Sequence, residues 1–359
     1  MDIDERFDVI VIGAGPAGCI AAINLRSDFK VLLIDRLPLP RNKSCAGILK
    51  PSAMRLLESY NPPEHIFSRP QTIGVTFFDW EVGWQYRLPY TYTNTNRTKF
   101  DGWLLGLASQ RNNVEVWEKT HFISIEDVAG GPVLTFKKDD STIRVGANAV
   151  IAADGPNSRV RKSIGRTDQS FYFTLQEWIK PKEGHGITDF YGFIDERTCL
   201  YDWMVPKDDI LVIGGIYDKQ DNPTGRLNHL KQRIRTEFGI EGDTVEGPKG
   251  YPIIKLGSMA EVFLGEGRVL LAGEAAGFID ASICEGISYA LRSGILCAQA
   301  VNTSPDNPVR AYGKLTGAVR ALTFFDLVKY ISFKQRQLRP LYYTLIPQIK
   351  TVKRIHHNS

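Results

Sequence analysis

Three glycines near the start of the chain have the spacing of a dinucleotide-binding turn. Gly13, Gly15 and Gly18 stand in G-x-G-x-x-G register, directly after the apolar run of residues 7–12. Such a turn brings backbone N–H groups close to a pyrophosphate and aims the start of the next helix at its charge. The spacing alone is weak evidence, because a chance glycine turn in an α/β protein can share it.

The residues around the glycines supply the elements that this chemistry needs. Residues 7–12 predict a buried parallel strand, residues 16–26 a helix and residues 30–35 a second strand. Pro16 fits the first helical turn, where its missing N–H needs no partner. Asp35 ends the second strand, where its carboxylate would accept hydrogen bonds from the ribose hydroxyls. This order of elements predicts a dinucleotide held through its AMP portion.

Two later segments indicate which dinucleotide is bound. The segment "AVIAADGPNSRVRKSIG" predicts a strand followed by Asp154 and Gly155, and "GRVLLAGEAAGFIDASICEGISYALRSG" a strand followed by Gly273 and Glu274. A helix is expected to start at Gly286. Small residues in such segments let the backbone approach a cofactor closely.

Both segments resemble the class A flavoprotein monooxygenases, which are built like p-hydroxybenzoate hydroxylase. The resemblance implies FAD as the cofactor, with the later segment at the ribityl chain and the helix start facing the isoalloxazine. Glu274 stands where the family has Asp and keeps the charge. The predicted FAD-binding residues are Gly13, Gly15, Pro16, Ala17, Gly18, Asp35, Arg36, Arg41, Ala46, Gly47, Asp154, Gly155, Gly273, Glu274, Gly277, Gly286 and Ile287.

Two further motifs resemble geranylgeranyl reductases. "RNKSCAG" matches their R-x-K-x-C-G-G loop except at Ala46, and "LYDWMVP" matches Y-x-W-x-F-P except at Val205. The resemblance is strongest to short bacterial CbrA-like flavoproteins, and flavoproteins that mature cysteine tryptophylquinone belong to the same broad set. Flavin halogenases are disfavoured because the first Trp of their W-x-W-x-I-P motif is missing. The motifs imply four catalytic candidates: Lys43, Cys45, Tyr201 and Trp203.

Each catalytic candidate also has a plain structural interpretation. Cys45 is either a redox thiol near the flavin or a small buried residue. Lys43, like Arg41, either balances flavin charge or is a solvated loop charge. Tyr201 and Trp203 either line a flat apolar pocket, with Trp80, Trp84, Trp178 and Tyr191, or belong to an ordinary sheet core.

The predicted fold class is α/β (α+β), a Rossmann-type FAD-binding domain with an inserted antiparallel β-sheet substrate domain. The FAD-binding domain is expected at 1–70, 96–165 and 264–330. Residues 71–95 and 166–263, rich in alternating aromatic segments, are expected to form the substrate domain. Residues 331–359 are expected to form a basic C-terminal helix or tail.

Composition narrows the remaining function classes. The 359 residues are 43% hydrophobic and 23% charged with a net charge of +4, and no nucleic-acid-binding motif is present. Five scattered cysteines and six scattered histidines predict neither a disulfide framework nor a metal site. The acidic start "MDIDERFDVIVIG" and the lack of an apolar run of roughly 20 residues predict a cytoplasmic protein.

The last fifty residues hold ten Lys or Arg against one acid, Asp326. Such a segment predicts contact with a membrane surface or a partner protein, or else a basic outer face on a packed helix.

The sequence therefore predicts an FAD-dependent oxidoreductase. The first hypothesis is monooxygenase-type chemistry on an aromatic group of a small molecule or of a protein side chain, such as a tryptophan matured to cysteine tryptophylquinone. The alternatives are reduction of isoprenoid double bonds and a non-catalytic flavin-bearing partner protein. Because no second G-x-G-x-x-G follows a strand, the electrons are expected from a visiting donor such as NAD(P)H, a partner protein or the substrate.

Overall fold

A computed structural model describes residues 3–41, 43–340 and 351–354, which divide into two units. Unit 1 holds the described residues of 1–41, 98–170 and 254–327, and unit 2 those of 42–97, 171–253 and 328–359. Each unit is therefore assembled from three separate stretches of chain. Residues 42–70, expected in the FAD-binding domain, group with unit 2 because their strands pair there.

The sheet of unit 1 has the strand order β17-β18-β11-β1-β2-β8, and β9 and β10 extend it from β11. Strands β18, β11, β1, β2 and β8 all run parallel. The buried run Val9 to Ile12 explains the central place of β1, since such strands are covered on both faces. The strands are β1 (Glu5–Ile12), β2 (Val31–Ile34), β8 (Val114–Trp117), β9 (Thr120–Val128), β10 (Gly131–Lys138), β11 (Ser141–Ala152), β17 (Gly265–Glu266) and β18 (Val269–Leu271).

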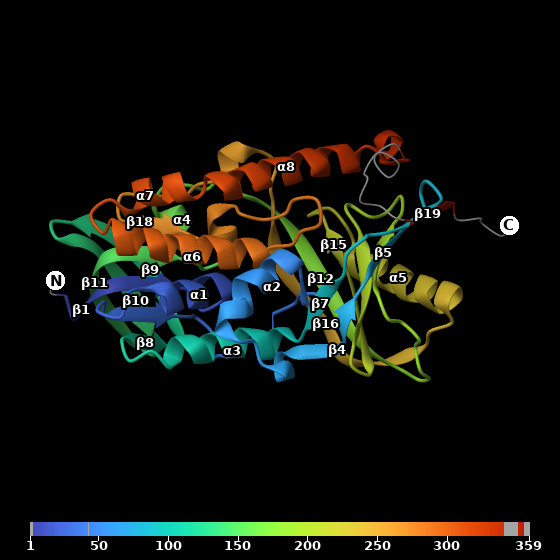
Figure 1. The fold of residues 1–359 in the computed structure, drawn as a ribbon, viewed down its shortest axis with the longest axis horizontal. Helices are drawn as coiled ribbons and strands as arrows, with labels where there is room; N and C mark the ends of the chain where they lie inside the picture. The colour runs from blue at the N-terminus through green and yellow to red at the C-terminus, as the bar shows by residue number, and fades with distance from the viewer. Residues whose placement is uncertain (1–2, 42, 341–350, 355–359) are drawn as a thin grey trace. The chain divides into compact units, whose positions relative to one another are not determined.

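Helices α1 and α6 pack side by side in unit 1 (Figure 1). Gly294 permits this approach, because a Cβ there would collide with the carbonyl oxygen of Ala17. No helix in the described residues is both long and apolar enough to cross a bilayer. The helices are α1 (Pro16–Asn24), α3 (Arg97–Ser109), α4 (Arg159–Ser163), η3 (Met259–Glu261), η4 (Gly273–Ala276), α6 (Ile287–Thr303), α7 (Pro308–Leu315) and α8 (Gly317–Lys334), of which α3 and α8 extend into unit 2.

The main sheet of unit 2 has the order β16-β12-β15-β14-β13-β5-β6-β19, and a small sheet has the order β3-β7-β4. The expectation of purely antiparallel strands is wrong at one pair, since β13 and β5 run parallel. More than a hundred residues separate these two strands, which is ample for the crossover that a parallel pair needs. The strands are β3 (Ile48–Leu49), β4 (Phe67–Ile73), β5 (Val75–Asp79), β6 (Trp84–Arg87), β7 (Tyr92–Thr95), β12 (Ser170–Pro181), β13 (Phe190–Ile194), β14 (Asp202–Lys207), β15 (Ile210–Tyr217), β16 (Gly242–Lys255) and β19 (Thr351–Arg354); the helices are α2 (Pro51–Leu57), η1 (Glu58–Tyr60), η2 (Glu64–Ile66), α5 (Pro223–Phe238) and η5 (Arg336–Leu338).

The two faces of this sheet separate aromatic residues that the sequence offered as candidates either for one pocket or for the sheet core. Trp80 packs with Phe193 and the apolar side of α5, and Tyr191 packs against the same core. Trp203 lies on the other face, because side chains alternate along β14 and its neighbour Met204 belongs to the α5 core. Tyr201 shares the Trp203 face.

A buried ion pair joins α5 to the same sheet. Arg226 of α5 donates to the Asp202 carboxylate at 3.0 Å and to Asp221 at 3.0 Å. Burial raises the pKa of Asp202 to about 7, and Arg226 opposes that rise. Above the pH at which Asp202 ionises, the guanidinium is the group that compensates the buried charge.

We expect Arg226→Met to destabilise the protein by about 3–5 kcal/mol at pH 8, because Asp202 loses its cation and must either stay buried as an unpaired charge or take up a proton. At pH 5 the loss is smaller. The folded pKa of about 7 lies above the ordinary value of 3.8, so the folded state binds the proton more tightly and Asp202 is then neutral. Thermal unfolding at both pH values measures the difference. Arg235→Met, on the same helix but 70% exposed, should lose no more than about 1 kcal/mol at either pH. Equal losses of unfolding free energy for the two variants would show that Arg226 does not compensate a buried charge on Asp202.

Candidate functional site

Three chain segments meet at the carboxyl ends of the parallel strands in unit 1. Backbone hydrogen bonds join the loop after each strand to the neighbouring strand. These bonds run from Gly13 N–H to Ile34 O (2.8 Å), from Ala153 N–H to Ile12 O (2.7 Å) and from Ala272 N–H to Ala152 O (2.9 Å). The glycine turn, the Asp154 segment and the Gly273 segment therefore lie along one edge, where open α/β sheets bind ligands.

The glycine turn tolerates no side chain at two of its three glycines. Gly13 has φ +100°, and a Cβ there would collide with the carbonyl of Ala153 and lie 3.0 Å from Cα of Asp154. A Cβ on Gly18 would collide with the carbonyl oxygen of Gly13. The turn and the start of α1 are thus packed backbone against backbone, which leaves their N–H groups close to any ligand at the edge.

Asp35 and Arg41 form an ion pair over the glycine turn. The Asp35 carboxylate also accepts the N–H groups of Ala14 and Leu37, each at 3.0 Å. A Cβ on Gly15 would lie 3.1 Å from Nη2 of Arg41, so this guanidinium rests directly on the turn. Arg36, predicted to contact the cofactor, is exposed after β2.

Two groups along this edge have no side-chain partner among the described residues and fit a dinucleotide. Helix α1 begins at Pro16 without a side-chain cap or an acidic residue in its first turn, so its N–H groups are available to a pyrophosphate. Oδ1 of Asp154 is buried and accepts no hydrogen bond from the described residues, while Oδ2 accepts the N–H of Arg159 at 2.8 Å. Burial raises the pKa of this carboxyl. An orphan acceptor of this kind suits a hydroxyl donor such as a ribityl chain.

The segment after β18 brings its predicted residues together with α1 and α6. Gly273 has φ +58°, and a Cβ there would touch Ala17 at 3.4 Å. Glu274 lies beside Gly286, with 3.8 Å from its Cγ to a Cβ built on that glycine, and Ile287 begins α6. Gly277 packs closely against backbone, since a Cβ there would lie 2.9 Å from the carbonyl oxygen of Glu261. In the Asp154 segment, Gly155 has φ +82°.

Arg161 is a site residue that the sequence analysis did not single out. Its side chain is fully buried and donates to the carbonyl oxygens of Ala275 at 3.2 Å and Glu261 at 2.7 Å, and to Asp168 at 3.0 Å. It therefore ties the Asp154 segment to the turn that carries Glu274. The signal was the last Arg of "SRVR" in the segment that follows Asp154, and only its burial reveals its role.

In unit 2 a buried lysine holds the loop that contains Cys45. Nζ of Lys207 donates to the carbonyl oxygens of Gly47 at 3.1 Å and Thr95 at 2.7 Å, and also to Oδ1 of Asn94. Burial lowers the pKa of Lys207 to about 7. Gly47 has φ +63°, and a Cβ there would crowd Thr95 and Lys207. Lys207, another residue that the sequence analysis missed, therefore fixes the carboxyl end of this loop.

The other end of the loop rests on β16. Nζ of Lys43 lies 4.5 Å from the ring centroid of Tyr251, and the Ser44 hydroxyl donates to the carbonyl oxygen of Lys249 at 3.1 Å. Cys45 and Ala46 lie between these two anchors and are half-buried. The three predicted residues Lys43, Cys45 and Ala46 thus share one well-anchored loop.

Tyr201 and Trp203 belong to an aromatic cluster on the face of the sheet opposite α5. Tyr201 packs edge-on against Phe77 with ring centroids 5.6 Å apart, and Trp203 packs edge-on against Tyr201 at 6.2 Å. Phe77 stacks on Tyr86 at 5.2 Å. Trp203 is buried, yet its indole N–H has no hydrogen-bond acceptor in the described part of the chain. The cluster is apolar with one unmatched donor.

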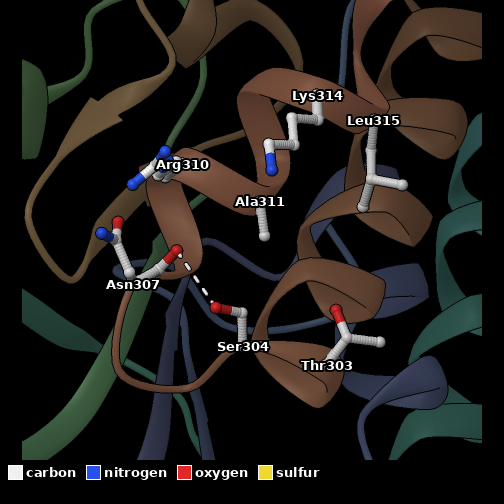
Figure 2. A pocket seen from close by; sticks show the side chains of 7 residues that line it. All are labelled: Thr303, Ser304, Asn307, Arg310, Ala311, Lys314 and Leu315. Atoms are coloured by element: carbon white, nitrogen blue, oxygen red, sulfur yellow. Dashed lines mark hydrogen bonds between the residues drawn. The ribbon is translucent and has the colours of Figure 1, made fainter.

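A shallow pocket of about 450 Å³ lies elsewhere, around the turn from α6 to α7 (Figure 2). The Ser304 hydroxyl donates a hydrogen bond to the carbonyl oxygen of Asn307 at 3.5 Å. Arg310 and Lys314 also line the pocket and are exposed. This pocket is at the far end of α6 from Gly286, about 25 Å along the helix. It is therefore separate from the dinucleotide edge.

The FAD-binding domain family model matches residues 6–291. The chain belongs to this family. CbrA of Escherichia coli K12 is 30% identical over 334 residues, covering 90% of this chain and 92% of CbrA. Together with the edge geometry, the family identifies FAD as the cofactor and the protein as an FAD-dependent oxidoreductase.

Solved structures share the fold of this family member. A geranylgeranyl bacteriochlorophyll reductase-like protein of Thermoplasma acidophilum has a TM-score of 0.81 at 20% identity, covering 94% of this chain and 90% of that one. The p-nitrophenol 4-monooxygenase of Pseudomonas putida has a TM-score of 0.70 at 14% identity, covering 95% and 93%. The predicted α/β fold of the p-hydroxybenzoate hydroxylase type is therefore confirmed. The likeness to these two proteins concerns the fold and not their activities.

We expect Gly13→Ala and Gly18→Ala each to lose at least about 90% of bound FAD, because a Cβ at either position collides with backbone and pushes the turn away from the pyrophosphate. The flavin-to-protein absorbance ratio of the purified protein measures this. Gly106→Ala is the matched control in the same unit, since a Cβ there meets no atom within 4 Å. Full flavin content in both variants would show that the glycine turn does not hold FAD.

We expect Lys207→Met to lower stability by about 2–4 kcal/mol, because Thr95 O and Asn94 Oδ1 lose their buried donor. Thermal unfolding measures the loss. Lys180→Met, which removes a lysine that is 61% exposed, should change stability by no more than about 0.5 kcal/mol. An unchanged Lys207→Met protein would mean that the loop does not depend on this ammonium.

Proposed function

We propose that the protein performs monooxygenase-type redox chemistry on a flat aromatic group, either of a small molecule or of a tryptophan in a partner protein. The aromatic face of unit 2 carries the proposal. The buried rings of Phe77, Tyr86 and Tyr201 would form one wall of the site, and the unmatched indole N–H of Trp203 would orient a substrate oxygen. An apolar wall with one placed donor is the usual composition of a site for a flat ligand.

The chain's own residues would bind, orient and exclude water. The α1 N-terminus, Gly273 and Asp154 would hold FAD, which when bound supplies the electron-transfer chemistry. Tyr201 and Phe77 would remove water from the ring that they bind, which protects reduced species from side reactions. Arg161 and Lys207 act as positioning residues, because each holds a loop through backbone carbonyls rather than through the ligand.

We infer that the electrons come from an external donor such as NAD(P)H. The only dinucleotide turn that the sequence shows is the one at Gly13. In the proposed reaction an aromatic C–H, O2, NADPH and a proton yield the aromatic alcohol, water and NADP⁺. The donor is thus a second substrate that visits and leaves.

A second candidate is reduction of isoprenoid double bonds. The R-x-K-x-C loop, with Lys43 and Cys45, and the Y-x-W motif of Tyr201 and Trp203 favour it, because both resemble geranylgeranyl reductases. An aromatic wall can bind a prenyl chain as well as a ring. The two candidates differ in whether O2 is consumed.

The test is turnover of the FAD-loaded protein with NADPH, ¹⁸O2 and a panel of phenols, indoles and tryptophan peptides. We expect one ¹⁸O atom in each molecule of product. Trp203→Phe should raise KM about fivefold to tenfold by removing the N–H donor, with unchanged flavin content. Trp80→Phe, on the α5 side of the same sheet, is the control and should leave KM unchanged.

Two results would overturn the first candidate. Anaerobic saturation of a prenyl lipid by the reduced protein, without label in any aromatic, would support the reductase. Oxidised flavin that no donor reduces would leave only the role of a non-catalytic flavin-bearing partner.

A further inference from the structure

Helix α8 carries an apolar stripe on its outer side. The stripe comprises Leu322, Phe324, Phe325, Val328 and Ile331, which are 44%, 51%, 59%, 45% and 50% exposed. Leu322, Phe325, Val328 and Ile331 follow one another at intervals of three residues, and Phe324 lies four residues before Val328, so the five share one half of the helix surface. Five large apolar side chains left half in water along three turns form a patch that marks an interaction surface.

The opposite side of α8 fixes the direction of the stripe. Val319, Thr323 and Asp326 are buried, and the Tyr289 hydroxyl of α6 donates to Oδ2 of Asp326 at 2.5 Å. Turning the stripe inward would expose these residues and break that bond. Figure 1 shows α8 running beside α6, in agreement with this hydrogen bond.

The exposed charges of α8 are positive. Arg320, Lys329 and Lys334 are exposed, whereas Asp326, the one acid of the helix, is buried and hydrogen-bonded. An apolar stripe bordered by cations, with no exposed acid, matches the interface of a bilayer that contains anionic lipid.

We propose that the outer side of α8 docks on the surface of an anionic membrane. The phenylalanines enter the headgroup boundary while the cations meet lipid phosphates. The helix itself does not cross the bilayer, because its other side is packed against protein. The proposal concerns location only and does not depend on which substrate the flavin site takes.

A second copy of the chain fits this surface less well. Two α8 helices laid together would bring Arg320, Lys329 and Lys334 of one copy near the same cations of the other. A stable interface also takes about 800 Å² from each partner, more than five half-exposed side chains provide.

The basic residues that follow α8 are less suited to the role. Arg339 is 5% exposed and pairs with Asp79 at 3.1 Å and with Glu81, and Arg336 pairs with Glu81 at 3.4 Å. These two cations are therefore engaged inside unit 2. Residues 341–350 and 355–359 of the predicted basic tail lie outside the described residues.

The test is co-sedimentation of the FAD-loaded full chain with vesicles of phosphatidylglycerol and phosphatidylcholine. We expect binding that weakens with salt and is absent on pure phosphatidylcholine. The double variant Phe324→Glu/Phe325→Glu should lower the apparent affinity at least about tenfold, because it removes two aromatic anchors and adds like charge to the lipid. Ile123→Glu, at a position that is 50% exposed on β9, is the matched control and should bind as the parent does.

Flavin absorbance verifies that each variant is folded, and Phe324→Gln/Phe325→Gln replaces the double variant if its flavin is lost. The proposal is wrong if the parent does not bind anionic vesicles, or if the phenylalanine variant binds equally well. It is also wrong if sedimentation velocity shows a dimer that the same substitutions abolish, since the stripe then belongs to a second copy.

Discussion

The structure depends on the hydrogen bonds that join neighbouring strand ends in the parallel sheet of unit 1. They hold Gly13 against Ala153, and Ala272 against Ala152, although these residues are far apart along the chain. Because the contact at Gly13 is backbone on backbone, it admits only glycine there. This edge fits FAD, because α1 begins there without a side-chain cap and Asp154 keeps one carboxylate oxygen without a partner in the described residues.

The sequence predicted this edge well because local patterns determine it. Strand, glycine turn, helix and Asp35 are adjacent in the chain, and the Asp154 and Gly273 segments each carry their own motif.

The sheet of unit 2 was predicted less completely. Alternation along β5 and β14 indicates strands but not which face meets α5, so Trp80 and Trp203 were offered as candidates for one pocket although they lie on opposite faces. The parallel pair of β13 and β5 has no local signal at all.

The residues that sequence analysis missed are two buried cations, Arg161 and Lys207. Both act through backbone carbonyls of segments that are distant in sequence: Ala275 and Glu261 for Arg161, Gly47 for Lys207. A carbonyl acceptor is present in every residue, so no side-chain pattern announces such a contact. Burying a cation is costly unless hydrogen bonds compensate it, and here several acceptors surround each one. Each of these cations therefore holds together chain segments that are distant in sequence.

The division of each unit among three stretches of chain has a consequence for biosynthesis. The parallel sheet needs β18 (Val269–Leu271), which the ribosome makes long after β1 and after most of unit 2. The nascent chain must therefore keep β11 without its neighbour β18 while the second unit emerges. Non-local pairing of this kind slows folding and lengthens the exposure of apolar strands. The edge that binds the cofactor is therefore complete only late in translation.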